Sequence, residues 1–306
     1  MTSYSSSSSR GSFTPRQTNT LEITSISRDE FLETLDSEVF VDVNKLREYA
    51  RHGIPEEIRG DVWKFLLGTE KPNRFDEITM RKSRAEFYDA IDKENPETSK
   101  RVRGEVNRYF KRLGKKCPFD TRTTPATFES VICAYLNTNH AIEYSPRLVQ
   151  MCTPFVLTMK KDFDVFSCFE RLMSIMDAYA LKMPINKRIA QFLTYFRIAL
   201  PDLCSYFEEE EVDMNEWASS WLRYLLSREL PLPCILRLWD VYFSQPEFMD
   251  FHPYVCLAIL NTMKETLEDL DQSEIRTQLL CLPEIDIPQI INQAFNFRSE
   301  ISASYK

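Results

Sequence analysis

Hydrophobic residues along most of the chain recur with the spacing of one face of an α-helix. The clearest case is Phe128, Val131, Ile132, Tyr135 and Leu136, which follow one another at i, i+3, i+4, i+7 and i+8. Similar spacing or end signals predict further helices within residues 27–35, 43–51, 55–67, 82–93, 98–113, 163–179, 189–200, 214–226, 234–243, 254–270, 274–281 and 289–297. The spacing between these segments is irregular, which argues against an ankyrin, TPR or HEAT array. We therefore expect a single, irregular, all-α domain.

Glycine and proline positions support this prediction. All six glycines fall within the first 114 residues, so no later segment can form a glycine-rich phosphate loop, a Rossmann turn or a nucleophile elbow. The prolines of the last third are expected to separate its helices; they lie at positions 231, 233, 246, 253, 283 and 288. The chain is thus not expected to bind a nucleotide through a loop of its own.

The first 21 residues are rich in serine and threonine and contain no acidic residue before Glu22. This composition is shared by disordered tails and mitochondrial transit peptides. The segment lacks the apolar face that a transit helix needs, which favours a disordered tail over residues 1–26. Order is expected to begin with Ser27 and Glu30, a capping-box pair, so that residues 27–306 form the helical domain.

Composition and charge narrow the possible functions. The 306 residues are 43% hydrophobic and carry a net charge of -8, which argues for a large core and against nucleic acid as a partner. The eight cysteines form no C-x-x-C pair and the three histidines are isolated, so we expect no metal site and a reducing, cytoplasmic environment. No apolar run reaches about 18 residues, so no transmembrane helix is expected.

Two segments carry candidate functional residues. Within residues 52–68, Arg59 and Trp63 would share one helix face, although an ordinary amphipathic helix with a half-buried tryptophan would give the same pattern. Within residues 101–110, Glu105 and Arg108 lie three apart. The carboxylate of Glu105 could orient the guanidinium of Arg108, or it could pair across the fold with Arg59.

Together with two later segments, these motifs resemble the TBC domain of Rab GTPase-activating proteins. The later segments are residues 130–173, with Tyr144, and residues 230–240, which end in Arg237-Leu238-Trp239-Asp240. The resemblance covers about residues 50–245. It implies an all-α TBC-type fold, a role in vesicle trafficking, and Arg108 as an arginine finger, with Arg59, Trp63, Glu105 and Tyr144 in support.

One position departs from the family pattern. Where the family places its catalytic glutamine, two residues after the tyrosine, this chain has Pro146. Proline has no side-chain amide and cannot position a water molecule. Gln150, one helical turn further on, is a possible substitute if that segment is helical, although a shift of roughly 5 to 6 Å is large for positioning a nucleophile.

The resemblance therefore leaves two functions open. The first is a GTPase-activating protein that supplies Arg108 in trans to a Rab-type small GTPase, where GTP and magnesium belong to the partner and the chain needs no cofactor. The second is a catalytically impaired pseudo-GAP that serves as a scaffold or regulatory subunit of a larger complex. Arg108 favours the first and Pro146 the second, so whether the chain acts as an enzyme is left open. In either case we expect a cytoplasmic protein that its partner GTPase recruits to membranes.

Overall fold

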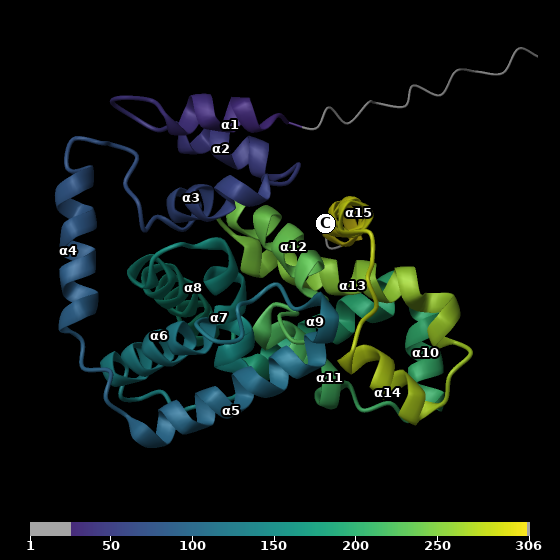
Figure 1. Ribbon diagram of the computed structural model, residues 1–306. Coiled ribbons are helices and arrows are strands. Elements are labelled where there is room, and N and C mark those ends of the chain that lie inside the picture. Colours follow the sequence, from purple (N-terminus) through teal and green to yellow (C-terminus); the bar gives the residue numbers. More distant parts are fainter. Residues whose placement is uncertain (1–25, 305–306) are drawn as a thin grey trace, which may run out of the picture.

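Helices α1 to α15 account for nearly all regular structure in residues 26–304, the part of the chain that the structure, a computed structural model, describes (Figure 1). The first eight are α1 Arg28–Leu35, α2 Val43–Ala50, α3 Glu56–Leu67, α4 Glu77–Ala90, α5 Pro96–Leu113, α6 Thr124–Thr138, α7 Arg147–Thr158 and α8 Asp162–Lys182. The others are α9 Ile185–Ala199, α10 Pro201–Glu209, α11 Met214–Tyr224, α12 Leu232–Ser244, α13 Phe248–Leu267, α14 Gln272–Leu280 and α15 Ile287–Ser304. The all-α prediction is confirmed. The tail predicted over residues 1–26 lies, except for residue 26, outside the described residues.

The ends of the early helices follow from local sequence. Ser27 and Glu30 form the predicted capping box at the start of α1, with hydrogen bonds of 3.3 and 2.7 Å between side chain and backbone. Gly68 ends α3 in the left-handed conformation, at φ 77°, where a residue with a Cβ would be strained. The only β-type pairing within residues 26–304 is one isolated antiparallel bridge between Phe40 and Asn73.

The helices form two groups joined through α12. In the first group, α5 packs on α6 and α7, these pack on α8, and α4 stands at the edge of the molecule against α8 (Figure 1). In the second group, α13 and α15 lie side by side, with α9 and α11 packed nearby. Helix α12 contacts α2, α3 and α7 on one side and α13 and α15 on the other. Helix α12 therefore packs the N-terminal helices against the last third of the chain.

Aromatic side chains fill the junction where α3, α7 and α12 meet. The indole of Trp63 lies 5.7 Å from the ring of Phe155 and 5.0 Å from the ring of Phe243, in edge-to-face geometry that aromatic pairs favour. Trp63 is fully buried. The half-buried tryptophan that an ordinary amphipathic helix would carry at this position is not what the structure has.

Two helices did not follow from the sequence pattern. Every residue of α7 from Leu148 to Phe155 is buried, so α7 has no polar face to create a periodic pattern, and Pro154 lies inside it. In α10 the first residue is Pro201, whose fixed φ suits the first turn of a helix. The prediction that Pro253 separates two helices is wrong: α13 already starts at Phe248 and runs through it.

Candidate functional site

Helix α5 displays Arg108 on the surface. The side chain of Asn95 caps its first turn with a 3.0 Å hydrogen bond to the backbone of Thr98, and Pro96 occupies the first position. One face is buried through Val102, Val106, Tyr109 and Phe110. Arg108 lies off this face, and 69% of its side chain is exposed.

Glu105 orients the Arg108 guanidinium. Its Oε2 accepts hydrogen bonds from Nε and Nη2 of Arg108, at 3.0 and 2.6 Å. Only 13% of the Glu105 side chain is exposed, and ion pairs held in partly buried positions lose less to solvent screening than fully exposed ones. Of the two arrangements that the sequence left open for Glu105, the structure has the pair with Arg108.

A second helix holds Glu105 in turn. The amide Nε2 of Gln150, in α7, donates a 3.0 Å hydrogen bond to Oε1 of Glu105. Gln150 is 4% exposed, and its Oε1 is buried without a hydrogen-bond partner among the described residues. The segment is helical, as a substitute glutamine would require, but its amide faces Glu105 and not solvent. Gln150, Glu105 and Arg108 therefore form a relay from the interior to the surface.

Tyr144 lies beside this relay, at the end of the loop that leads into α7. The guanidinium carbon of Arg101 lies 4.5 Å from the centre of its ring, within the range of a cation–π contact. Burial raises the pKa of Tyr144, the Glu105 carboxylate raises it further, and Arg101 and Arg108 oppose the rise. The hydroxyl is buried without a hydrogen-bond partner in residues 26–304. Tyr144 thus shares its electrostatic environment with Arg108 and Glu105.

Pro146 is exposed and takes the N-cap position of α7, with φ -52° and ψ -26°. The next residue, Arg147, fixes this end of the helix: its Nη1 donates a 2.6 Å hydrogen bond to Ser220, and its guanidinium lies over the ring of Tyr224 at 4.3 Å. The position at which the family pattern has a glutamine is therefore on the surface, next to an anchored residue, but it carries no amide.

Arg59 and Trp63 form a separate cluster around Asp240, a fully buried carboxylate in α12. Nε of Arg59 lies 3.1 Å and Nε1 of Trp63 lies 2.8 Å from its Oδ1, and the backbone N–H of Ile54 donates to its Oδ2 at 3.0 Å. Burial raises the pKa of Asp240 to about 6, and the Arg59 charge and these donors limit the rise. The cluster joins the start of α3 to α12.

The sequence motifs contained Asp240 but did not assign it a partner. The available signal was an acid within the otherwise hydrophobic segment from Leu238 to Phe243, because a buried carboxylate needs a cation and several donors. The two clusters share no hydrogen bond, but α7 touches both: Gln150 bonds Glu105, and Phe155 packs on Trp63. Arg59 and Trp63 therefore support the helix that orients Arg108.

Neither a metal site nor a membrane-spanning helix is found among the described residues. No group of three or more His, Cys, Asp or Glu side chains in residues 26–304 is arranged so that it could hold a metal ion. In the same range, no helix combines the length and the apolarity that crossing a bilayer requires.

Comparison with known proteins identifies a family and relatives to which this chain is similar. The model of the Rab-GTPase-TBC domain family matches residues 56–268. Human TBC1 domain family member 22B is 26% identical over 84% of this chain and 57% of its own length, and GTPase-activating protein gyp1 of Schizosaccharomyces pombe is 25% identical over 90% and 61%. The chain thus spans about three fifths of the length of these relatives.

Two solved structures share the fold. The Ypt/Rab-GAP domain of Gyp1p superposes with a TM-score of 0.76 at 20% identity, covering 90% of this chain and 98% of that one. The Chlamydomonas flagellar RabGAP TBC domain gives a TM-score of 0.63 at 18% identity, with coverage of 83% and 85%. With the family match over more than half of its residues, the chain belongs to the Rab-GTPase-TBC domain family.

Proposed function

We propose that this protein activates GTP hydrolysis by a Rab-type small GTPase and that Arg108 is the group it supplies in trans. The observation that carries the proposal is the relay from Gln150 through Glu105 to an arginine whose side chain is 69% exposed. Membership of the family and the similarity to a fission-yeast protein named as a GTPase-activating protein support the same activity.

The chemistry requires a cation that is already oriented. Negative charge develops on the γ-phosphoryl oxygens during GTP hydrolysis, and a planar guanidinium stabilises it by paired hydrogen bonds. Glu105 fixes the direction of Arg108 before the partner arrives, which lowers the entropy lost on binding. Nη1 of Arg108 has no hydrogen-bond partner among the described residues and remains available for the phosphate. GTP and magnesium belong to the GTPase.

Water must be oriented by another group, since Pro146 has no amide and Gln150 is buried. In this proposal the partner's own glutamine orients the attacking water, as it does where an activator contributes only an arginine. The protein would then act on the membranes where that GTPase resides.

A second candidate function is a pseudo-GAP that binds the GTPase without accelerating hydrolysis, as a scaffold or a subunit of a larger complex. It is favoured by the exposed Pro146 at the N-terminus of α7, where the family pattern has an amide.

Single-turnover GTP hydrolysis across a panel of Rab GTPases, with affinity measured separately, tests both functions. Stimulation by the parent protein that Arg108→Lys abolishes supports the activator. Binding of one or more GTPases without any stimulation would exclude the activator and support the pseudo-GAP. Stimulation gained in Pro146→Gln alone would identify this position as the cause of the lost activity.

A further inference from the structure

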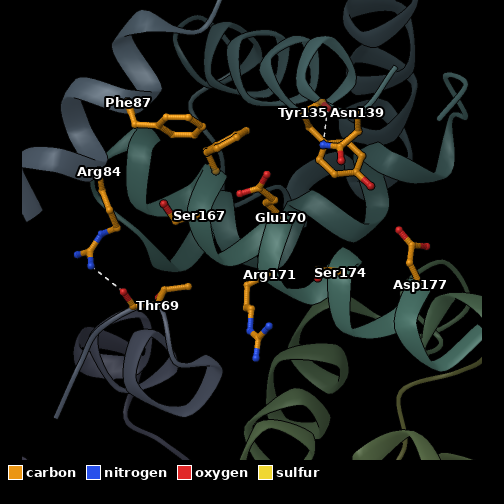
Figure 2. A pocket seen from close by; sticks show the side chains of 11 residues that line it. Thr69, Arg84, Phe87, Tyr135, Asn139, Ser167, Glu170, Arg171, Ser174 and Asp177 are labelled. Atoms are coloured by element: carbon orange, nitrogen blue, oxygen red, sulfur yellow. Dashed lines mark hydrogen bonds between the residues drawn. The ribbon is translucent and has the colours of Figure 1, made fainter. Parts of the chain in front are cut away.

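A cavity of about 520 Å³ lies between α4, α6 and α8 and is bordered by Thr69 from the loop after α3 (Figure 2). Figure 2 shows two distinct ends. Phe87 lies at one end, and Tyr135 and Asp177 lie at the other. The ring centre of Phe166 is 6.4 Å from that of Phe87. None of the residues assigned to GTPase activation lines it.

Two carboxylates on α8 face the cavity without partners. Glu170 and Asp177 are two helical turns apart, with Ser174 between them. Neither carboxylate has a hydrogen bond or an ion pair with any residue in 26–304. Glu170 is half-buried and Asp177 is exposed, and the partial loss of water raises the pKa of both groups by disfavouring their charged form.

Tyr135 provides an independent sign of a missing ligand. This residue is 2% exposed, yet its hydroxyl has no hydrogen-bond partner among the described residues. Tyr135 lines the cavity, and Asp177 and Glu170 lie near enough to add to the rise that burial causes in the pKa of its hydroxyl. A buried hydroxyl without a partner costs free energy, which a ligand with a hydrogen-bond donor would recover.

The arginines that line the cavity do not neutralise these acids. Arg84 donates to the Glu70 carboxylate and, at 2.6 Å, to the backbone oxygen of Thr69. Nε of Arg171 donates at 3.2 Å to the backbone oxygen of Leu67, and Figure 2 shows its side chain directed away from Glu170. Figure 2 shows Arg84 at the opposite end of the cavity from Tyr135 and Asp177, and Arg171 below Glu170, directed out of the cavity.

We propose that this cavity is a binding site for an organic cation: an ammonium or guanidinium group on a hydrocarbon stem. N–H groups of the ligand donate to Glu170 and, about two helical turns further along α8, to Asp177 and the hydroxyl oxygen of Tyr135. The stem lies toward the exposed ring of Phe87, which is 55% accessible. Two carboxylates and a hydroxyl suit N–H donors, and the described residues gather no third acid, histidine or cysteine for a metal ion. The cation comes either from a free polyamine or from a lysine or arginine side chain of a partner protein.

Calorimetric titration of the full chain at low ionic strength tests the proposal with two probes: spermidine, and a capped peptide of four lysines. We expect saturable binding of at least one probe with one equivalent. Glu170→Gln should weaken it roughly tenfold or more, since hydrogen bonds to charged groups carry more free energy than neutral ones. Spermidine binding identifies the free cation as the source, and binding of the peptide alone identifies a partner's side chain.

The matched control is Glu265→Gln, which removes the same charge from an exposed site on α13 and should change neither affinity nor stoichiometry. Near the raised pKa of Glu170, binding should also release protons, because a bound cation lowers that pKa; heats measured in buffers of different ionisation enthalpy report this. Glu170→Gln should fold normally, as its neutral amide avoids the cost of a half-buried charge. Absence of saturable binding for both probes, or equal binding in the Glu170→Gln/Asp177→Asn double variant, would overturn the proposal.

Discussion

The amide of Gln150 donates a 3.0 Å hydrogen bond to Glu105, a residue 45 positions earlier in the chain. The other oxygen of Glu105 accepts both hydrogen bonds from Arg108, so α7 and α5 together set the direction of an exposed guanidinium. The loop with Tyr144 and Pro146 leads directly into α7. A change at the start of α7 can therefore alter the direction of the Arg108 guanidinium without contacting this residue.

Replacing Arg108 by lysine should remove most of the stimulation of GTP hydrolysis. An arginine finger is worth on the order of 10³ to 10⁵ in rate, and an ammonium group cannot reproduce the planar guanidinium fork. Affinity for the GTPase should change much less. Single-turnover hydrolysis and equilibrium binding to one responsive Rab GTPase measure the two effects separately.

Arg103→Lys is the matched control for this substitution. Arg103 lies on the same helix, 63% of its side chain is exposed, and it pairs with Glu129 at 2.7 Å. Because exposed ion pairs contribute little, hydrolysis should stay within about twofold of the parent. Equal losses in both variants would mean that the basic surface of α5, and not Arg108 in particular, is responsible.

Gln150→Met should lower the stimulated rate by roughly tenfold, less than Arg108→Lys, by releasing one oxygen of Glu105. Methionine fills a similar volume and removes the amide oxygen that already lacks a partner, so the fold should persist. Gln191→Met, on α9, removes a half-buried amide that bonds Tyr195 and serves as the control. An unchanged rate in Gln150→Met would exclude the relay as the means of orienting Arg108.

Two glycines should respond to alanine with opposite signs. A Cβ at Gly60 would lie 2.3 Å from the backbone oxygen of Thr158, so α3 and α7 would have to separate, at a cost of about 1 to 3 kcal/mol. A Cβ at Gly104 would meet nothing closer than Nη1 of Arg108 at 3.7 Å, and alanine should stabilise α5 by about 0.5 to 1 kcal/mol. Urea unfolding measures both, and a stabilised Gly60→Ala would contradict the close approach of the two helices.

Acid should destabilise the protein through His252, which is fully buried. Its Nε2 lies 2.8 Å from the carbonyl oxygen of Trp221, which can only accept, so Nδ1 accepts the 2.6 Å bond from the Tyr242 hydroxyl. Burial lowers the pKa of His252 to about 3. The unfolded chain binds a proton near pH 6.5 and the folded chain does not, so the free energy of unfolding falls as pH falls below that value.

The loss from His252 should reach roughly 2 kcal/mol at pH 5. The measurement compares urea unfolding at pH 7.5 and pH 5 in the parent and in His252→Gln, which should be less stable at both values but lose this part of the pH dependence. His140→Gln removes an exposed histidine and should keep the parent's dependence. Protonation of Asp240, whose pKa burial raises to about 6, adds stability over the same pH range, so the test is the difference between parent and variant. Equal pH dependence in the parent and in His252→Gln would exclude a neutral buried His252.

The sequence predicted best where a local rule determines the structure. The capping box at Ser27, the end of α3 at Gly68 and the spacing of Glu105 and Arg108 each depend on residues a few positions apart. Helix α7 could not be predicted from local sequence. Burial on all sides leaves it without a polar face, and Pro154 is typical of a break in a helix. In α13, packing on α15 maintains the helix through Pro253 despite its missing N–H.

The same distinction between local spacing and tertiary packing applies to the candidate site. The orientation of Arg108 by Glu105 could be inferred from helical spacing, but the contact with Gln150 depends on how α5 and α7 pack. The partner of Arg59 could not be predicted from the sequence either, because Asp240 lies 181 residues further along the chain. A pattern along one helix carries no information about which distant helix covers it.

The position of Asp240 also bears on how the domain assembles during synthesis. Its carboxylate accepts hydrogen bonds from Ile54, Arg59 and Trp63, which precede it by more than 170 residues. A nascent chain in which α12 has not yet left the ribosome has no acceptor for these three donors. Until α12 emerges, α3 can pack on α7 and α8 but lacks this anchor, so the growing chain passes through a partly assembled state of the kind common in larger proteins.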